Sequence, residues 1–316
     1  MTRTFCGPDT GAIWFGNPGS LVRLPDPSPD VETVRTREVA VHVGVSGGRT
    51  VDVSGSGLRT FTYAFSRLTQ AEFDVIDAFH AGVHGPGPFA LVDPVHSNRL
   101  TTNQSSGGTV YGDTSGFATA APGAVMVDTC TSHATGSSIL WSLPARELWN
   151  LELPSGWACL PDGTRAFPVI PGVRVNLAGW VMPYQSTWIG WQPSFYDATG
   201  APISQYPCGT DAYTAHAWQH MSGYAVAPPA AAWIAPRITA VSLTAGTGVE
   251  PAGLHIDELS MTYGNHPHGP DARPGSGIPQ VAISEWTQTI PHIGHMDAKL
   301  ALTEVSADWA RQEASP

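Results

Sequence analysis

Glycine and proline interrupt this sequence from end to end and limit the length of any regular element. The chain has 34 Gly and 28 Pro among 316 residues, and only 13% of its residues are charged. Gly and Pro favour turns and break helices, while a low charged fraction leaves few residues for exposed helix faces. We therefore expect an all-β protein of short strands and many turns, divided into about two domains.

The charge balance and the hydropathy exclude several classes of partner. With 26 acidic against 15 basic side chains, the formal net charge is −11. Nucleic-acid binding depends on Lys and Arg that neutralise phosphates, so neither nucleic acid nor an acidic lipid surface is an expected partner. The first residues, MTRTFCGPDTGAIWFG, lack the apolar stretch of a secretion signal, and no segment has the roughly 20 apolar residues of a membrane span. We expect a protein made in the cytoplasm, without a membrane span.

The segment up to about residue 93 has the pattern of strands followed by one helix. Residues 38–56, EVAVHVGVSGGRTVDVSGS, alternate apolar and polar residues on both sides of a Ser-Gly-Gly turn, which predicts two paired strands. The same turn matches G-x-S-x-G, but a nucleophile elbow needs a helix after the Ser and a strand follows here. LRTFTYAFSRL, residues 58–68, predicts a further strand.

The helix is predicted over LTQAEFDVIDAFHAG, residues 68–82. Thr69 is the expected N-cap and Glu72 its partner in a capping box. Phe73, Ile76 and Phe79 recur at helical spacing, and Gly82 ends the pattern. We expect an amphipathic helix that lies on a β-sandwich and carries no chemistry.

Residues 55–106 resemble one family of known proteins. They contain, in order, the strand residues 61–63, a helix of the form LTxAEFDxIDAF, the loop and strand GPGPFALVDP and the polar run NRLTTNQSS. This succession resembles the distal tail and minor tail proteins of siphophages that infect actinobacteria. The resemblance implies a tail-protein β-sandwich that self-associates into a ring, hexameric in the family, at the tail tip of the virion. It also implies contacts with the tail tube protein, the tape measure protein and other baseplate or tail-fibre proteins.

Residues 107–264 have a different composition, with short alternating segments rich in Trp, Tyr, Ser, Thr and Gly. Such segments at turn-like spacing favour a β-sandwich of the jelly-roll type. A strand leading to GW, a strand ending in YDATGAPIS, the turn APPAAAWIAPRI and the strand LHIDELSMTYG follow one another here. This order resembles carbohydrate-binding modules of the jelly-roll class, which implies a glycan of the host cell wall as a ligand.

Aromatic side chains of this region are the candidates for glycan contacts, since sugars stack their C–H faces on aromatic rings. The candidates are Trp188, Trp191, Tyr196, Tyr213 and Trp218. Asp211 and His216 are polar residues close to them in sequence. Trp188 and Trp191 are three residues apart, so in a strand they point to opposite faces and at most one of them faces the core. For any single ring the alternative is a place in the core of the sandwich.

Two carboxylates are the candidates for a structural calcium ion, because jelly-roll modules hold calcium with carboxylate and carbonyl oxygens at a strand end. They are Asp113, in YGDTSG, and Asp257, in the last strand. No D-x-D-x-D-G loop accompanies them, and no other cofactor is expected. The cysteines are Cys6, Cys130, Cys159 and Cys208, and they form no C-x-x-C pair of a zinc site. Reduced thiols are one interpretation and a Cys159–Cys208 disulfide is the other.

Two polar stretches mark the predicted domain boundaries, residues 101–108 and the Gly- and Pro-rich residues 264–280. Apolar residues between Lys299 and Val305 suit a hairpin arm or a closing strand, and the segment resembles the terminal strand of phage tail proteins. We therefore predict a jelly roll inserted into a first domain. The predicted parts are a ring-forming domain (1–104), the jelly roll (105–264), a linker (265–280) and strands that return to the first domain (281–316).

Together these patterns predict a structural protein of a phage tail tip, with no catalytic residues. The alternative is an extracellular protein that binds or hydrolyses glycan. A hydrolase requires two carboxyls about 5 to 10 Å apart. The candidates are Glu147, Glu152, Asp162, Asp197 and Asp211. A secreted lectin would be a monomer, whereas the tail interpretation predicts a ring with its interface in residues 1–100 and 280–316, and leaves a hexamer or a trimer open.

Overall fold

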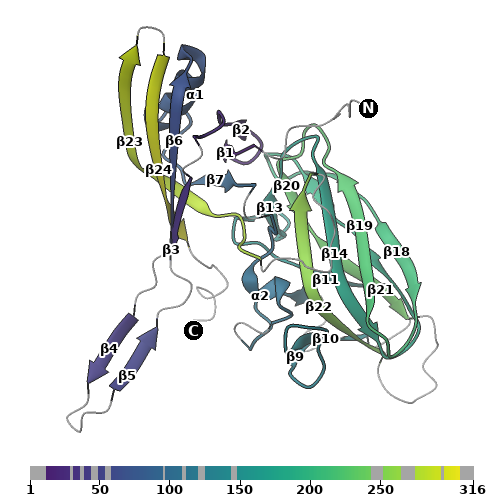
Figure 1. The fold of residues 1–316 in the computed structure, drawn as a ribbon. Helices are drawn as coiled ribbons and strands as arrows, with labels where there is room; N and C mark the ends of the chain where they lie inside the picture. Colours follow the sequence, from purple (N-terminus) through teal and green to yellow (C-terminus); the bar gives the residue numbers. More distant parts are fainter. Residues whose placement is uncertain are drawn as a thin grey trace, which may run out of the picture. The chain divides into compact units, whose positions relative to one another are not determined.

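The chain forms two compact units. A computed structural model describes residues 12–28, 31–35, 39–43, 49–53, 58–94, 97–108, 112–119, 125–143, 148–242, 252–264, 275–292 and 295–306. The discontinuous unit consists of Ala12–Val92 and the chain from Pro279 onward, and the jelly-roll unit is Asp93–Ile278 (Figure 1). In sequence, the jelly-roll unit therefore lies between two stretches of the discontinuous unit.

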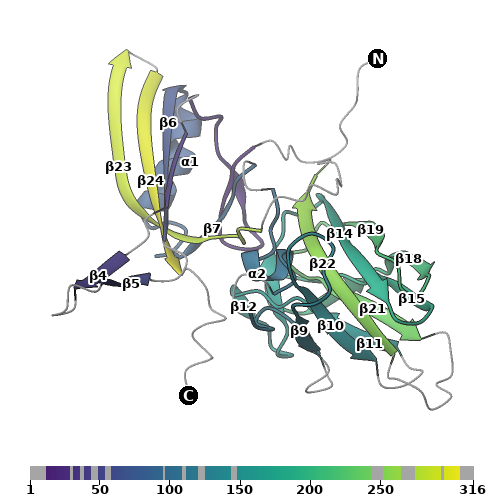
Figure 2. The same cartoon turned by 60° about the horizontal axis from the view of Figure 1, so that its bottom comes forward.

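The discontinuous unit is built on a seven-stranded antiparallel sheet with the order β2-β1-β7-β23-β24-β6-β3. Its strands are β1 (Trp14–Gly16), β2 (Val22–Arg23), β3 (Glu32–Arg35), β6 (Arg59–Leu68), β7 (Phe89–Val92), β23 (Gln280–His292) and β24 (His295–Ser306). β24 pairs with β6 from Met296 to Thr303, so the end of the chain returns to the first stretch (Figure 2). The predicted strand at 58–68 and the predicted closing strand near the C-terminus are both confirmed.

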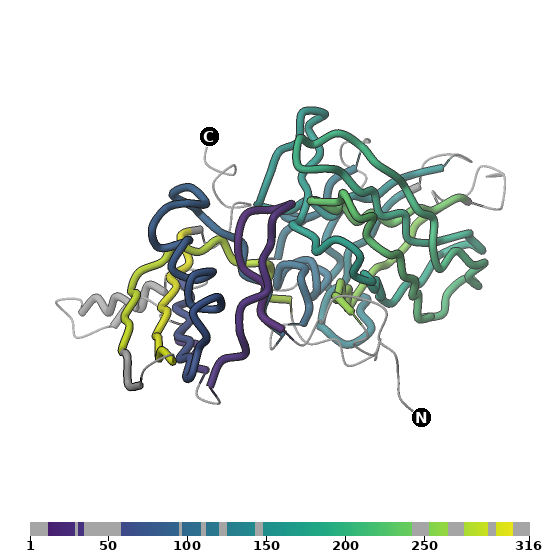
Figure 3. Tube along the Cα trace, turned by 90° about the horizontal axis from the view of Figure 1, so that it is seen from above, coloured from purple at the N-terminus to yellow at the C-terminus, as the bar shows by residue number. Residues whose placement is uncertain are grey.

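Helix α1 (Gln70–His80) begins as its sequence predicts. The backbone N–H of Glu72 donates to Thr69 Oγ1 at 3.4 Å, and the backbone N–H of Thr69 donates to Glu72 Oε2 at 2.9 Å. This reciprocal pair is a capping box. Gly82 follows the helix at φ +77°, a conformation that a side chain would strain. α1 packs on β6 and β24 (Figure 3).

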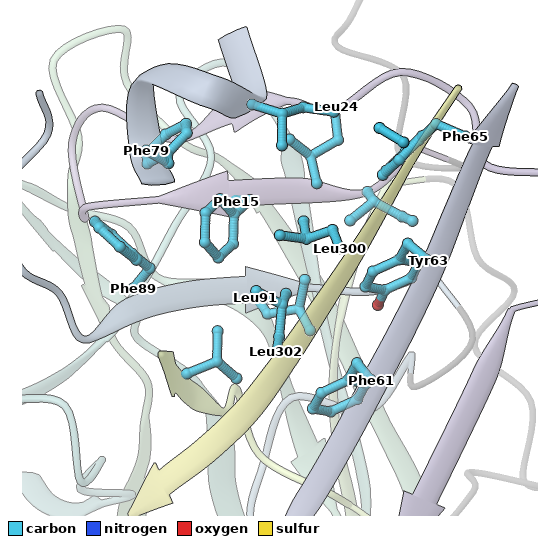
Figure 4. Close-up of a cluster of buried hydrophobic side chains, with 14 of the residues drawn as sticks. Phe15, Leu24, Phe61, Tyr63, Phe65, Phe79, Phe89, Leu91, Leu300 and Leu302 are labelled. Atoms are coloured by element: carbon cyan, nitrogen blue, oxygen red, sulfur yellow. The ribbon is translucent and has the colours of Figure 1, made fainter. Parts of the chain in front are cut away.

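The core of the discontinuous unit joins residues from both stretches of the chain (Figure 4). Phe15 of β1, Phe79 of α1 and Phe89 of β7 form a group of rings whose centroids lie 4.8 to 5.3 Å apart. Leu300 and Leu302 of β24 are fully buried in the same cluster. Burial of each such side chain stabilises the fold by about 1.5 to 3 kcal/mol. The apolar contacts therefore depend on the return of the last strand.

Strands β4 (Val39–Val43) and β5 (Arg49–Val53) form a separate two-stranded sheet. Their register runs from the pair Val39 and Val53 to the pair Val43 and Arg49. The predicted pairing of these strands is confirmed. The predicted turn at 44–48 lies outside the described residues.

The jelly-roll unit is a sandwich of two five-stranded sheets, with the orders β19-β14-β22-β10-β9 and β18-β15-β21-β11-β8, and it carries a third sheet of order β12-β13-β20-β16-β17. The strands of the first sheet are β9 (Val125–Asp128), β10 (Ser138–Leu143), β14 (Arg174–Pro183), β19 (Gln219–Val226) and β22 (Ala252–Tyr263). Those of the second are β8 (Ala118–Thr119), β11 (Leu148–Glu152), β15 (Thr187–Trp191), β18 (Cys208–Tyr213) and β21 (Arg237–Ser242). Those of the third are β12 (Ala158–Cys159), β13 (Arg165–Pro168), β16 (Ser194–Tyr196), β17 (Pro202–Gln205) and β20 (Trp233–Ala235). The predicted all-β class, with a jelly-roll sandwich, is confirmed.

The polar run near residue 101 differs from its predicted role as a hinge. It contains helix α2 (Thr102–Ser105), and Gln104 at its centre is fully buried. The side-chain N–H of Gln104 donates to Gly116 O at 2.7 Å and to Pro154 O at 2.9 Å. Just before it, Asn98 accepts a hydrogen bond from Met261 N at 3.1 Å. Amide side chains here satisfy buried backbone groups of the jelly roll, so polar composition does not mean exposure. The first boundary between the units therefore falls between Val92 and Asp93 instead of at 104/105, and the second, between Ile278 and Pro279, falls within the predicted linker 265–280.

The cysteines of the described residues are free. Cys159 is exposed on β12, and Cys208 lies on β18 in a different sheet. The interpretation of a Cys159–Cys208 disulfide is therefore wrong for this structure. Burial raises the pKa of Cys208 to about 11, which keeps its thiol protonated. Cys6 lies outside the described residues.

No helix in the described part of the chain is long and apolar enough to span a membrane.

Candidate functional site

The sheet β18-β15-β21-β11-β8 has one face in the core and one face turned outward. Ile189 and Trp191 of β15 and Ile238 of β21 are fully buried in the core. Because side chains alternate along a strand, the residues between them face outward. Strand pairing arranges the outward residues of β11, β21 and β15 in three cross-strand rows, about 7 Å apart along the strands.

The first row is apolar and centres on an exposed ring. Leu148 pairs with Val241, which pairs with Trp188, and Trp188 pairs with Ala212 of β18. The side chain of Trp188 is 44% exposed and that of Leu148 is 56% exposed. Trp188 is thus an indole held on a flat strand surface with one side available to a ligand.

The second row is neutral and polar. Asn150 pairs with Thr239, which pairs with Gly190. Asn150 Oδ1 is buried and has no hydrogen-bond partner. A Cβ at Gly190 would lie 2.4 Å from Thr210 Oγ1, so only glycine fits this position without a shift. The side chain of Thr210 therefore occupies the space over Gly190, and Asn150 Oδ1 lies beneath the surface.

The third row is an ion pair. Glu152 pairs with Arg237 across β11 and β21, and Glu152 Oε1 lies 3.2 Å from Arg237 Nη2. Arg237 Nε is buried and has no hydrogen-bond partner. The carboxylate and the guanidinium of this row balance, so the three rows carry no net charge.

The predicted aromatic residues do not converge on this face. Trp188 lies there, whereas Trp191 and Tyr196 are buried in the core and the third sheet. Tyr213 is 7% exposed, and burial together with the nearby charge of Asp211 raises its pKa to about 12. Trp218 lies by the other five-stranded sheet, where it contacts His133 and His255. Of the five candidates, Trp188 is the ring that remains exposed on a sheet face.

The second aromatic cluster is occupied by the protein itself. The ring of His133 stacks on Trp180 with centroids 3.9 Å apart and 14° between the planes. His133 Nδ1 lies 2.6 Å from Glu258 Oε2, and Trp218 meets the His133 ring edge-on at 5.7 Å. The histidine therefore covers the Trp180 ring that a sugar would need. We interpret this cluster as a support for the loop that carries His133.

The residues around Asp257 do not fit the calcium ion expected from the resemblance to jelly-roll modules. Asp257 Oδ2 accepts hydrogen bonds from the backbone of His133 at 2.9 Å and of Ala134 at 3.2 Å. Its Oδ1 accepts from Thr135 Oγ1 at 2.5 Å and from the backbone of Glu258 at 2.8 Å. The backbone N–H of Thr135 adds a longer bond to Oδ2 at 3.5 Å, so five donors use the lone pairs of the fully buried carboxylate.

Asp113, the other calcium candidate, forms a local turn. Its Oδ1 accepts from the backbone of Ser115 at 2.9 Å and from Asn103 Nδ2 at 3.2 Å. Within the ranges that the structure describes, no group of three or more His, Cys, Asp or Glu side chains could hold a metal ion. The two aspartates are therefore structural hydrogen-bond acceptors here.

The carboxyls named for a hydrolase have local partners. Asp162 Oδ1 accepts from Thr164 N at 2.9 Å, and Asp197 Oδ1 accepts from Thr199 N at 2.8 Å, each within a turn. Glu152 pairs with Arg237, as described above. Glu147 lies outside the described residues.

Sequence reasoning missed the polar residues of the candidate site. The signal was present as alternation in LWNLE and RITAVS, where Leu, Asn and Glu in one segment and Arg, Thr and Val in the other face the same way. Only the pairing of β11 with β21 brings these two sets into common rows.

No protein-family model matches this chain, and no curated protein matches it. Among solved structures, it is similar to the CBM22-1 xylan-binding domain from Paenibacillus barcinonensis Xyn10C, with 14% identity over 50% of this chain and 92% of that chain and a TM-score of 0.36. The enzymatically active domain of tailspike protein 4 from bacteriophage CBA120 is 17% identical over 52% of this chain and 21% of that chain, with a TM-score of 0.36. A family 16 carbohydrate binding module is 10% identical over 44% of this chain and 85% of that chain, with a TM-score of 0.29. At these identities and TM-scores the similarities assign no ligand to the chain.

Proposed function

We propose that the jelly-roll unit binds a neutral glycan on the outward face of the sheet β18-β15-β21-β11-β8. The observation that carries this proposal is an exposed indole on a sheet face that also carries polar side chains and an ion pair. Trp188 offers a stacking ring, and Asn150 and the Glu152–Arg237 pair lie in the next rows of the same face. Sugars present apolar C–H faces and hydroxyls that both donate and accept, which matches this set.

The charge of the face favours a neutral sugar over an acidic one. The guanidinium of Arg237 already has a carboxylate partner in Glu152. A uronate or phosphate ligand would have to approach beside that carboxylate in a protein of net charge −11. The positive charge of Arg237, which would attract an acidic polymer, is therefore already paired with the carboxylate of Glu152. The rows span about 14 Å along the strands, so a ligand that contacts all of them is a chain of sugars.

The direct test is titration of the full chain with soluble xylan, a β-glucan, a galactan and a polyuronate, by calorimetry and affinity electrophoresis. We expect binding to a neutral polymer, and a loss of about tenfold or more in Trp188→Ala, because truncation of a central aromatic contact costs about 2 kcal/mol. Trp218→Ala is the matched control, since it removes an indole from the other sheet. Equal losses in both variants, or selective binding of the polyuronate, would contradict the site.

We further propose that the protein is a structural component of a siphophage tail tip, in which the discontinuous unit forms a ring and the jelly-roll unit faces the host. The support is the tail-protein resemblance of residues 55–106 and the division of the chain into two units. In a ring, several weak glycan contacts would add through multivalency. Particle electron microscopy and the mass of the purified chain test this role. A chain that stays monomeric and is absent from virions would exclude it without bearing on glycan binding.

A further inference from the structure

One long strand of the discontinuous unit has a free edge. β23 has 13 residues, and β7 pairs only with its first two, Gln280 and Val281. From Ala282 onward, β24 is its one partner strand within the described residues. Figures 1 and 2 both show β23 at the outer side of the group β23-β24-β6. Backbone N–H and C=O groups along such an edge are available to another strand.

The bulges and the Pro that usually prevent strand addition lie outside one five-residue stretch of this edge, and Pro291 follows that stretch. The pairing of β23 with β24 has register shifts near Ile283 and after Thr289, but is regular from Glu285 to Thr289. In that stretch Glu285 is the one charged residue, and it already pairs with Lys299 at 3.6 Å. Natural edges are commonly protected by charges, Pro or bulges. The regular stretch of β23 is thus a suitable template for one more strand.

The same chain contains a hairpin without a sheet to join. β4 and β5 have 5 residues each and pair with no other described strand. A two-stranded hairpin is marginally stable in water unless it packs on other structure. Each of its strands is as long as the regular stretch of β23.

The two strands on either side of the hairpin, β3 and β6, pair directly with each other. Arg35 of β3 and Arg59 of β6 are directly paired. The chain therefore leaves the sheet after Arg35, forms the hairpin and re-enters the sheet at Arg59. It leaves beside β3, and in the sheet order β6 and β24 separate β3 from β23. The hairpin and the free edge thus belong to opposite sides of this part of the sheet.

We propose that the hairpin β4–β5 of a second copy of this chain pairs with β23 at Glu285–Thr289. Two different surfaces on opposite sides of one sheet give a head-to-tail contact, which closes into a ring when the rotation between copies allows it. This inference rests on the proposed ring and identifies the contact that would build it. The new bonds are backbone N–H to C=O bonds between strands, as in other cases of strand addition.

The test compares the oligomeric mass of the full chain with that of a hairpin-deletion variant. Residues 37–57 are replaced by Asn-Gly, which closes β3 and β6 with a two-residue turn. We expect the parent to form an oligomer and the variant to have the mass of a single shortened chain, below the 33.4 kDa of one parent chain, by analytical ultracentrifugation. Glycan titration and circular dichroism of the variant check that both units are folded.

Disulfide trapping tests the predicted neighbours directly. Gln288→Cys combined with Thr50→Cys should give covalent oligomers under mild oxidation. Each single variant controls for the native thiols, and Ser222→Cys with Thr50→Cys places the same thiol on an exposed strand of the jelly roll. Two results with an oligomeric parent would overturn this contact and leave the ring proposal standing. In one, the deletion variant forms an oligomer of the same number of chains as the parent; in the other, the cysteine pair gives no trapped product. A parent that remains monomeric at high concentration would overturn both.

Discussion

The carboxylate of Glu304 accepts hydrogen bonds from both the side chain and the backbone of Arg59. Arg59 Nη2 donates to Oε1 at 2.8 Å, and Nε and the backbone N–H donate to Oε2 at 2.9 and 3.0 Å. Both residues are buried, and 245 positions separate them in the sequence, with the whole jelly-roll unit in between. The ion pair therefore links β24, the last strand of the chain, to β6 and joins the two stretches of the discontinuous unit.

Removal of this carboxylate should strongly destabilise the discontinuous unit. Glu304→Ala leaves the Arg59 guanidinium buried without a counter-charge, a change that costs about 3 to 5 kcal/mol of unfolding free energy. Hydrogen exchange of the β6 and β24 amides measures this loss. Lys299→Ala is the control, because it breaks an exposed pair with Glu285 and should cost about 1 kcal/mol or less. Equal protection in the two variants would show that the buried pair is not the closing contact.

Asp257 should stabilise the jelly-roll unit without a metal. Asp257→Asn removes the charge that five donors share and replaces one acceptor oxygen by a donor, so we expect a loss of about 2 to 4 kcal/mol. Asp113→Asn changes an exposed turn and should cost less than about 1 kcal/mol. Thermal unfolding of both variants and of the parent, with calcium and with a chelator, is the measurement. A rise in the melting temperature of the parent on addition of calcium would contradict the hydrogen-bonded arrangement.

Local signals in the sequence predicted the elements whose stabilising contacts are themselves local. Thr69 and Glu72 are three residues apart, and their capping box identified α1. The alternation on both sides of 44–48 identified β4 and β5. Such patterns report short-range hydrogen bonds and the period of one element. Composition and alternation predicted the all-β class as well, whereas the return of the last strand followed from the resemblance to phage tail proteins.

The candidate site depends on contacts that no local pattern records. Trp188 and Trp191 were equal candidates in sequence, and the choice between them followed from which face of β15 meets the core. Asn150 and Arg237 come from strands far apart in the chain, and their shared surface exists only through the register of β11 on β21. Polar composition also misled at Gln104, whose amide is buried because it satisfies two backbone carbonyls.

The stability of the jelly-roll unit should fall in mild acid. Burial lowers the pKa of His255 despite the opposing charge of Asp128, and burial likewise lowers that of His220. In the unfolded chain these histidines titrate near 6.5, so below that pH the unfolded state binds more protons and stability decreases. Above about pH 7 this contribution should be constant.

The melting temperature between pH 7.5 and 5 measures this effect. We expect a decrease toward pH 5 that is smaller in His255→Gln, because the variant has no buried imidazole to protonate on unfolding. His216→Gln, at an exposed histidine of the same unit, is the matched substitution for comparison. Identical slopes in the parent and His255→Gln would exclude His255 as a source of the acid sensitivity.

A methyl group at position 190 should damage both the fold and the candidate site. In Gly190→Ala the new Cβ would lie 2.4 Å from Thr210 Oγ1 and 2.8 Å from Thr210 Cα, so β15 and β18 must separate. We expect a loss of about 1 to 3 kcal/mol in unfolding free energy and weaker glycan binding, since the shift displaces the strand that carries Trp188. Thr210→Ala alone should be nearly neutral. In the double variant it should rescue stability only in part, because the contact with the backbone carbon remains. Full rescue would mean that the Thr210 hydroxyl is the one atom that excludes a side chain at position 190. No loss of stability in Gly190→Ala would contradict the close approach of β15 and β18.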